Sequence, residues 1–347
     1  HATASRALAD WFEEETGTRV NTQAVPYSEI SQVAARDASL GAGRYDVVQY
    51  WYPMLGWLVQ RGVLADITAW WETSALELEV NDLVPVFRDA WCLAEGRRYG
   101  VPFDGDMHLL FYNTALFEKN GLVPPETWDD YAKAAKTISE AGAGSGVYGC
   151  GIMAVGVPII LIGTYLNRLA SFGGGFFDDE GQPAINSPEA VAALEHLITE
   201  LPYAVPDAAA VGFDEMLGPW LGGRVGMAEF WADLGKMTDN PEASRIVGQW
   251  GVAPLPKGPG PLGRIVAPLN AGWSLGLGAG MRHRESAQAF LGFCIRPETC
   301  LRICTIAGGL DPVRWSTYED PGYRDYATGP LADAAKEAVQ SAAVAWP

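Results

Sequence analysis

Short apolar runs typical of β-strands alternate along this chain with amphipathic segments typical of α-helices, and this alternation restricts the fold more than any other feature. Residues 2–16 are helix-like and are followed by Gly17, a common residue after a helix C-terminus. Residues 45–50 then form an apolar, strand-like run. The pattern predicts an α/β fold. Because 347 residues exceed what one hydrophobic core usually serves, we expect two lobes.

Local signals fix the starts of two further helices. Thr127, with Asp130 three residues later, is a variant of the capping box. Ser187 followed by Pro188 combines a capping side chain with a proline in the first turn. Residues 28–40 are also predicted to be helical. Further strands are expected at residues 19–25, 98–103, 109–113, 225–230, 250–255 and 273–277.

The composition excludes several classes of partner. A net charge of -18 makes nucleic acid and anionic membrane surfaces poor partners, because phosphate binding needs a basic face. With 48% hydrophobic and 19% charged residues, the chain is expected to be globular.

The longest apolar run, residues 155–166, is shorter than a membrane span and contains proline and glycine. The chain begins with His1 without a signal peptide, so we expect a processed or truncated product.

The spacing of the cysteines does not match a disulfide framework. Five of them are scattered along the chain, and only Cys300 and Cys304 are close enough to share one helix face. A zinc site would need more converging ligands, and no histidine accompanies this pair. We therefore expect buried thiols, and the sequence leaves a disulfide open.

Aromatic residues gather where the predicted strands end. Tyr50 and Trp51 follow one strand, Trp231 follows a second, and Trp273 begins a third. In open α/β sheets the ligand crevice lies outside the carboxyl ends of the strands. An aromatic ring there can pack its face against the apolar C–H surface of a sugar ring. Trp231 and Trp273 are therefore the strongest candidates for ligand contact.

Two acidic residues follow the strand that ends near residue 103. Asp104 and Asp106 flank Gly105, with His108 nearby, and carboxylates at this position would accept hydrogen bonds from ligand hydroxyl groups. A solvated turn, a cation site and a catalytic carboxylate pair for glycoside hydrolysis remain as alternatives. We find no P-loop, nucleophile elbow, HExxH or dinucleotide fingerprint, so we predict no cofactor, no metal and no enzymatic activity.

Several ordered segments carry a resemblance to a known family. They are YDVV at 45–48, YGVPF at 99–103, LFYN at 110–113, GRVGM at 223–227 and GWSLG at 272–276. In order and spacing the chain resembles the family 1 extracellular solute-binding proteins of bacterial ABC importers, which are maltose-binding-protein-like. The resemblance covers about residues 7–318. The family's first strand and its last helices have no counterpart here, so the chain is expected to be a fragment at both ends.

The resemblance implies a type II periplasmic-binding-protein fold, with two α/β lobes, a hinge and an interlobe cleft. The N-terminal lobe would contain residues 1–108 and 271–308, and the C-terminal lobe residues 109–270 and 309–347. Crossovers are expected near residues 107–110, 268–271 and 308–312. The resemblance, taken with the strand-end pattern, implies ligand-binding roles for Tyr50, Trp51, Asp104, Asp106, Tyr165, Trp231, Gly272, Trp273 and Arg314.

The resemblance also implies a function. The chain is expected to be the substrate-binding component of an ABC importer, binding a sugar or polyol and delivering it to the membrane permease. It would be a monomer, either periplasmic or extracellular, with a lipid anchor as an alternative. A receptor for a cationic solute such as a polyamine, and a glycoside hydrolase that uses Asp104 and Asp106, are the competing hypotheses.

Overall fold

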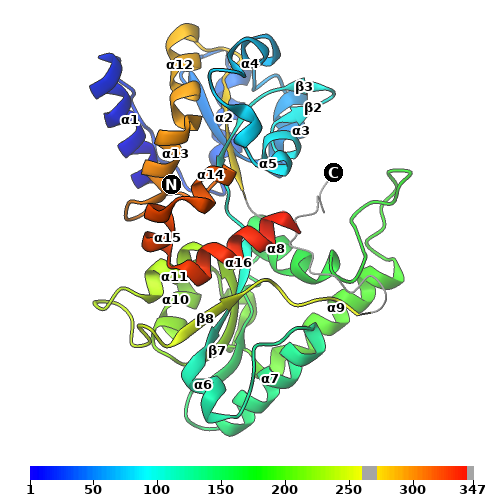
Figure 1. The fold of residues 1–347 in the computed structure, drawn as a ribbon. Helices are drawn as coiled ribbons and strands as arrows, with labels where there is room; N and C mark the ends of the chain where they lie inside the picture. The colour runs from blue at the N-terminus through cyan, green and yellow to red at the C-terminus, as the bar shows by residue number, and fades with distance from the viewer. Residues whose placement is uncertain (260–271, 342–347) are drawn as a thin grey trace. The chain divides into compact units, whose positions relative to one another are not determined.

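The computed structural model describes residues 1–259 and 272–341, and these form two compact α/β units (Figure 1). The first unit contains residues 1–106 and 272–326, and the second contains residues 107–259 and 327–341. Each unit has its own β-sheet and its own covering helices, so the expected division of the chain into two α/β bodies is confirmed.

The first unit is built on a three-stranded antiparallel sheet in the order β1-β9-β4. A two-stranded ladder, β2-β3, is separate from it. The strands are β1 (Val47–Trp51), β2 (Leu93–Ala94), β3 (Arg97–Arg98), β4 (Val101–Asp104) and β9 (Trp273–Leu277). The helices are α1 (Ala2–Thr16), α2 (Ile30–Ser39), α3 (Leu55–Gln60), α4 (Thr68–Ser74), α5 (Pro85–Ala90), α12 (Arg284–Ile295), α13 (Pro297–Cys304), α14 (Trp315–Glu319) and α15 (Pro321–Ala327).

Alternation along β1 separates the core of the first unit from its other sheet face. Val48 and Tyr50 are buried in a hydrophobic cluster with Leu55 and Leu58 of α3. Because successive side chains of a strand point to opposite faces, Gln49 and Trp51 lie on the other face. Val48 and Tyr50 therefore pack into the core, whereas Trp51, the last residue of β1, lies on the opposite face of the sheet.

The second unit contains a mixed four-stranded sheet in the order β6-β7-β5-β8, in which only the β6-β7 pair is parallel. Its strands are β5 (His108–Asn113), β6 (Tyr148–Gly151), β7 (Val225–Trp231) and β8 (Trp250–Ala253). Its helices are α6 (Thr114–Lys119), α7 (Trp128–Ala141), α8 (Pro158–Leu169), α9 (Pro188–Glu200), α10 (Phe213–Leu221), α11 (Asp233–Thr238) and α16 (Gly329–Gln340). Helix α7 packs on β6 and β7, and α16 packs on β8 and β5.

The helix boundaries that rested on capping signals are confirmed. The Thr127 side chain accepts from the Asp130 amide at the start of α7, and the Ser187 side chain accepts from the Ala190 amide at the start of α9. Gly17 ends α1 in the left-handed conformation. Each of these boundaries coincides with a local hydrogen bond at the helix end.

Two of the expected features are wrong. Residues 19–25 form no strand. They are mostly exposed and pair with none of the strands that the structure describes, so their backbone groups join no ladder there. The boundary expected near residues 308–312 is also misplaced. Residues 309–326 pack with the first unit, because Leu310 and Val313 are buried there and the Asp311 carbonyl accepts from the Gly105 amide at 3.1 Å. The crossover expected near residues 268–271 lies outside the described residues, and the hinge and cleft stay predictions.

The cysteines are buried thiols, as expected. All five are free, and burial raises the pKa of Cys92 and Cys300 to about 11. Both thiols therefore stay protonated at neutral pH. Within residues 1–259 and 272–341, no helix is both long and apolar enough to span a bilayer.

Candidate functional site

Three predicted site residues lie side by side at one end of the strands in the first unit's sheet. Trp51, the last residue of β1, pairs across the ladder with Trp273, the first residue of β9. On its other side Trp273 pairs with Asp104, the last residue of β4. Residues directly opposite each other in a sheet lie close together. The antiparallel register therefore places two indole rings and a carboxylate at the same strand ends.

The Asp104 carboxylate is held from two sides. Its Oδ2 lies 2.7 Å from His1 Nε2, and its Oδ1 accepts from the Asp311 amide at 2.7 Å. The His1 ring contacts Trp273 edge-on at 5.0 Å between centroids, and its Nδ1 lies 2.6 Å from Gln49 Nε2. Asp104 is only 4% exposed. It is therefore a buried, hydrogen-bonded carboxylate and not a solvated turn residue.

Two glycines allow close approach of the backbone at this edge. A Cβ at Gly105 would lie 1.9 Å from the Pro312 carbonyl oxygen, so only glycine fits against residues 311–312. Gly272 has φ +104, and a Cβ there would overlap the Trp91 ring. Its carbonyl accepts from the Tyr52 amide at 3.3 Å. Gly272 therefore allows the backbone turn at the start of β9. Asp106, which follows Gly105, is half-buried.

The second unit has a different set of residues at its strand ends. Trp231, the last residue of β7, pairs with His108, the first residue of β5. Their rings meet edge-to-face at 4.4 Å between centroids, and Phe213 flanks Trp231 at 5.8 Å. Trp231 is 5% exposed and His108 is 1% exposed. Burial lowers the pKa of His108 to about 3, although its contact with Asn167 opposes the shift.

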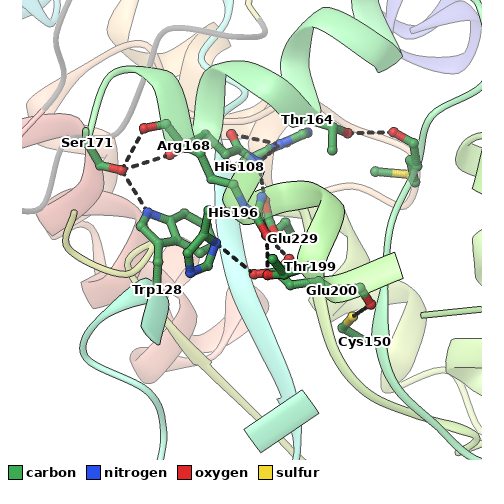
Figure 2. Close-up of polar contacts among 12 residues, drawn as sticks. His108, Trp128, Cys150, Thr164, Arg168, Ser171, His196, Thr199, Glu200 and Glu229 are labelled. Atoms are coloured by element: carbon green, nitrogen blue, oxygen red, sulfur yellow. Dashed lines mark hydrogen bonds and ion pairs between the residues drawn. The ribbon is translucent and has the colours of Figure 1, made fainter. Parts of the chain in front are cut away.

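A buried charge cluster is linked to His108 by hydrogen bonds through Asn167 (Figure 2). Arg168 of α8 donates two hydrogen bonds to the Glu229 carboxylate, from Nη1 to Oε2 at 3.1 Å and from Nη2 to Oε1 at 2.8 Å. Its Nη2 also pairs with Glu200. Its guanidinium stacks over the Trp128 ring at 4.1 Å. Burial by itself would lower the pKa of Arg168, but the two glutamates outweigh burial and raise it. Burial raises the pKa of Glu229, opposed by Arg168. Arg168, Glu200 and Glu229 are therefore all paired within the interior.

Two predicted contacts are wrong. Tyr50 is fully buried on the core face of β1, and its hydroxyl donates to the Trp91 carbonyl at 3.0 Å. Arg314 is also fully buried: its Nε donates to the Ile295 carbonyl at 2.8 Å, and its Nη atoms donate to Leu78, Glu79 and Asp82. The polar groups of Tyr50 and Arg314 therefore form hydrogen bonds within the first unit, and both residues are structural. The alternation of β1 and the inclusion of residues 309–326 in the first unit explain both errors.

The structure neither supports nor excludes a ligand contact for Tyr165. It lies on α8 and is half-buried, and its hydroxyl donates to the Ala190 carbonyl of α9 at 2.7 Å. Its ring contacts Phe176 at 6.3 Å between centroids. These contacts join two helices, and the ligand-binding role of Tyr165 stays a prediction.

The polar residues of the second unit were largely missed by sequence reasoning. Glu229 interrupts the apolar strand VGMAEFW, and Asn167 and Arg168 interrupt the apolar helix PIILIGTYLNRL. A charged residue inside an otherwise apolar element needs a buried partner, and this was the available signal. Among the described residues, no group of three or more His, Cys, Asp and Glu side chains is arranged to hold a metal ion.

The comparison with known protein families decides the identity. The model for bacterial extracellular solute-binding proteins matches residues 2–299, which is most of the chain. This chain belongs to that family. The strand-end residues of both units therefore belong to a solute-binding protein with the type II periplasmic-binding fold, as expected from the sequence.

Individual relatives share this fold at modest identity. Maltose-bound MalE3 of T. maritima superposes with a TM-score of 0.84 at 25% identity, covering 98% of this chain and 85% of that chain. The ribitol complex of an ABC transporter solute-binding protein from Agrobacterium radiobacter K84 gives a TM-score of 0.85 at 22% identity, covering 97% and 84%. A probable amino-acid ABC transporter periplasmic-binding protein of Sinorhizobium fredii is 27% identical, and the match covers 89% of this chain and 69% of the relative.

Proposed function

We propose that this solute-binding protein is the substrate-binding component of an ABC importer and takes a sugar or a polyol. The observation that supports this most is the arrangement of Trp273 between Trp51 and Asp104. Indole faces pack against the C–H surface of a carbohydrate, while a fixed carboxylate accepts hydrogen bonds from its hydroxyl groups. A binding site for a small ligand commonly combines aromatic walls with a few oriented polar groups.

The relatives support the ligand class. One solved neighbour holds maltose and another holds ribitol. The name of the S. fredii relative points instead to amino acids, so amino acids are the competing ligands. A cationic polyamine is less favoured, because ribitol and maltose, the ligands of the two solved neighbours, are uncharged.

The family favours binding without hydrolysis, because its model and a solved neighbour describe solute-binding proteins. We propose that the ligand is released unchanged to a membrane permease, that the protein works outside the cytoplasmic membrane, and that it is a monomer.

Calorimetric titration with separate ligands tests this proposal. The panel is ribitol, D-mannitol, maltose, L-glutamate, L-leucine and spermidine, with the ligand recovered afterwards and checked by NMR. We expect saturable binding of at least one sugar or polyol, which is recovered intact. Binding of an amino acid or spermidine alone, or recovery of a cleaved sugar, would overturn the proposal.

A further inference from the structure

The tautomer of His108 in the second unit follows from its hydrogen-bonded link to the charge cluster around Arg168 (Figure 2). Arg168 fixes the Glu229 carboxylate by its two-nitrogen contact. Glu229 Oε2 then accepts from Asn167 Nδ2 at 2.7 Å. Both oxygens of Glu229 accept from the Arg168 guanidinium, so Oε2 is an acceptor and the amide nitrogen of Asn167 must face it. The amide orientation of Asn167 is thereby set.

The second N–H of the same amide nitrogen sets the proton on His108. Asn167 Nδ2 lies 2.9 Å from His108 Nδ1, whereas Asn167 Oδ1 lies farther away, at 3.3 Å. A proton on Nδ1 would place two donors against each other at 2.9 Å. Nδ1 is therefore the acceptor, and in a neutral imidazole the proton is then on Nε2.

The imidazole is neutral, and its Nε2 has no partner within residues 1–259 and 272–341. Burial lowers the pKa of His108 to about 3, so the ring is uncharged at physiological pH. Among the residues that the structure describes, no group accepts a hydrogen bond from Nε2. A buried donor without an acceptor is costly. The ring also touches Trp231 at 4.4 Å, at the strand end considered above for ligand contact.

We propose that His108 is a ligand-binding residue, and that its Nε2–H donates to an oxygen of the sugar or polyol that packs on Trp231. This inference rests on the proposed function, because it takes Trp231 as a ligand-facing ring. Asn167 and Glu229 are positioning residues that select the tautomer of His108. A fixed N–H donor favours neutral or anionic acceptors and repels an ammonium group, so His108 discriminates against cationic solutes.

Two variants of His108 separate the hydrogen bond from the ring. His108→Gln keeps an N–H donor close to the Nε2 position, whereas His108→Phe keeps a ring and removes the donor. The probe is whichever of ribitol, D-mannitol and maltose the wild-type chain binds in calorimetry. We expect His108→Phe to weaken binding by about tenfold or more, and His108→Gln to retain most of the affinity. Equal affinity of His108→Phe and the wild type would overturn the proposal.

Nitrogen NMR on the ¹⁵N-histidine-labelled chain tests the tautomer without any variant having to bind. The His108 resonance is assigned by its loss in His108→Gln. We expect a proton on Nε2 and none on Nδ1 between pH 5 and pH 8, and a shift of Nε2 on saturation with the bound probe. An Nδ1–H tautomer, or an Nε2 that does not respond to a bound probe, would reject the role of His108. A wild-type chain that binds no sugar or polyol would instead reject the proposed function.

Discussion

The two units present polar groups at their strand ends in opposite ways. In the first unit a carboxylate, Asp104, stands directly beside Trp273 in the sheet. In the second unit the charges of Arg168 and Glu229 lie behind, and a neutral imidazole stands beside Trp231. One unit therefore offers an acceptor next to its tryptophan, and the other offers a donor. A hydroxyl group both donates and accepts, so a polyhydroxylated ligand suits both.

The two strand ends also share one feature. Trp51 Nε1 in the first unit and His108 Nε2 in the second are buried ring nitrogens that find no partner among the described residues. Such atoms are uncommon in folded proteins, because an unmade buried hydrogen bond destabilises the fold. Each strand end therefore contains one buried ring nitrogen for which the described residues provide no hydrogen-bond partner.

The largest expected effect concerns the charge cluster of the second unit. Arg168→Met leaves Glu229 and Glu200 buried without their cation, and breaking a buried ion pair in this way costs about 3–5 kcal/mol. Urea unfolding followed by circular dichroism measures the loss. The matched control is Arg97→Met in the first unit, because the Arg97–Asp66 pair is exposed and should contribute about 1 kcal/mol or less. Equal losses in the two variants would contradict a supporting role for the cluster.

The tryptophans at the two strand ends should matter equally for binding. Trp231→Ala and Trp273→Ala are each expected to weaken sugar or polyol binding by about 2 kcal/mol or more, roughly 30-fold, because each removes a buried aromatic face. Trp57→Ala on α3 serves as the control, since Trp57 packs against the core of the first unit. If only one of the two strand-end variants loses affinity, the ligand uses one unit alone and the comparison fails.

The neutral His108 makes stability depend on pH. Its pKa in the folded chain is about 3, below the ordinary value of 6.5, so the unfolded chain binds a proton more readily. Its contribution to stability is complete above pH 6.5 and is lost as the pH falls from 6.5 toward 3, by about 2 kcal/mol at pH 5. The difference in unfolding free energy between the wild type and His108→Gln should therefore shrink across this range. A difference independent of pH would show that folding does not lower the pKa of His108.

Sequence reasoning succeeded where the signal is local. The starts of α7 and α9 depend on Thr127 and Ser187, whose side chains bond to amides three residues away. The positions of Trp51, Trp231 and Trp273 at strand ends also follow from runs of a few residues. These features need no knowledge of distant parts of the chain.

It failed where a residue's role depends on a distant partner. Arg314 is conspicuous in the sequence, yet its acceptors lie at Leu78 and Ile295 and make it structural. His108 was noticed without a role, because its tautomer depends on two distant residues. Asn167 is 59 residues from His108 along the chain, and Glu229 is a further 62 residues from Asn167. Long-range pairing of this kind cannot be read from periodicity or spacing.

Fluorine NMR on the 5-fluorotryptophan-labelled chain tests the central claim most directly, because each of the 13 tryptophans reports on its own surroundings. Resonances are assigned with single Trp→Phe variants, and the ligand is the sugar or polyol found by calorimetry. We predict that Trp51, Trp231 and Trp273 shift on saturation, while the fully buried Trp128 and Trp220 do not. Saturable binding that leaves all three strand-end resonances unmoved would contradict the account.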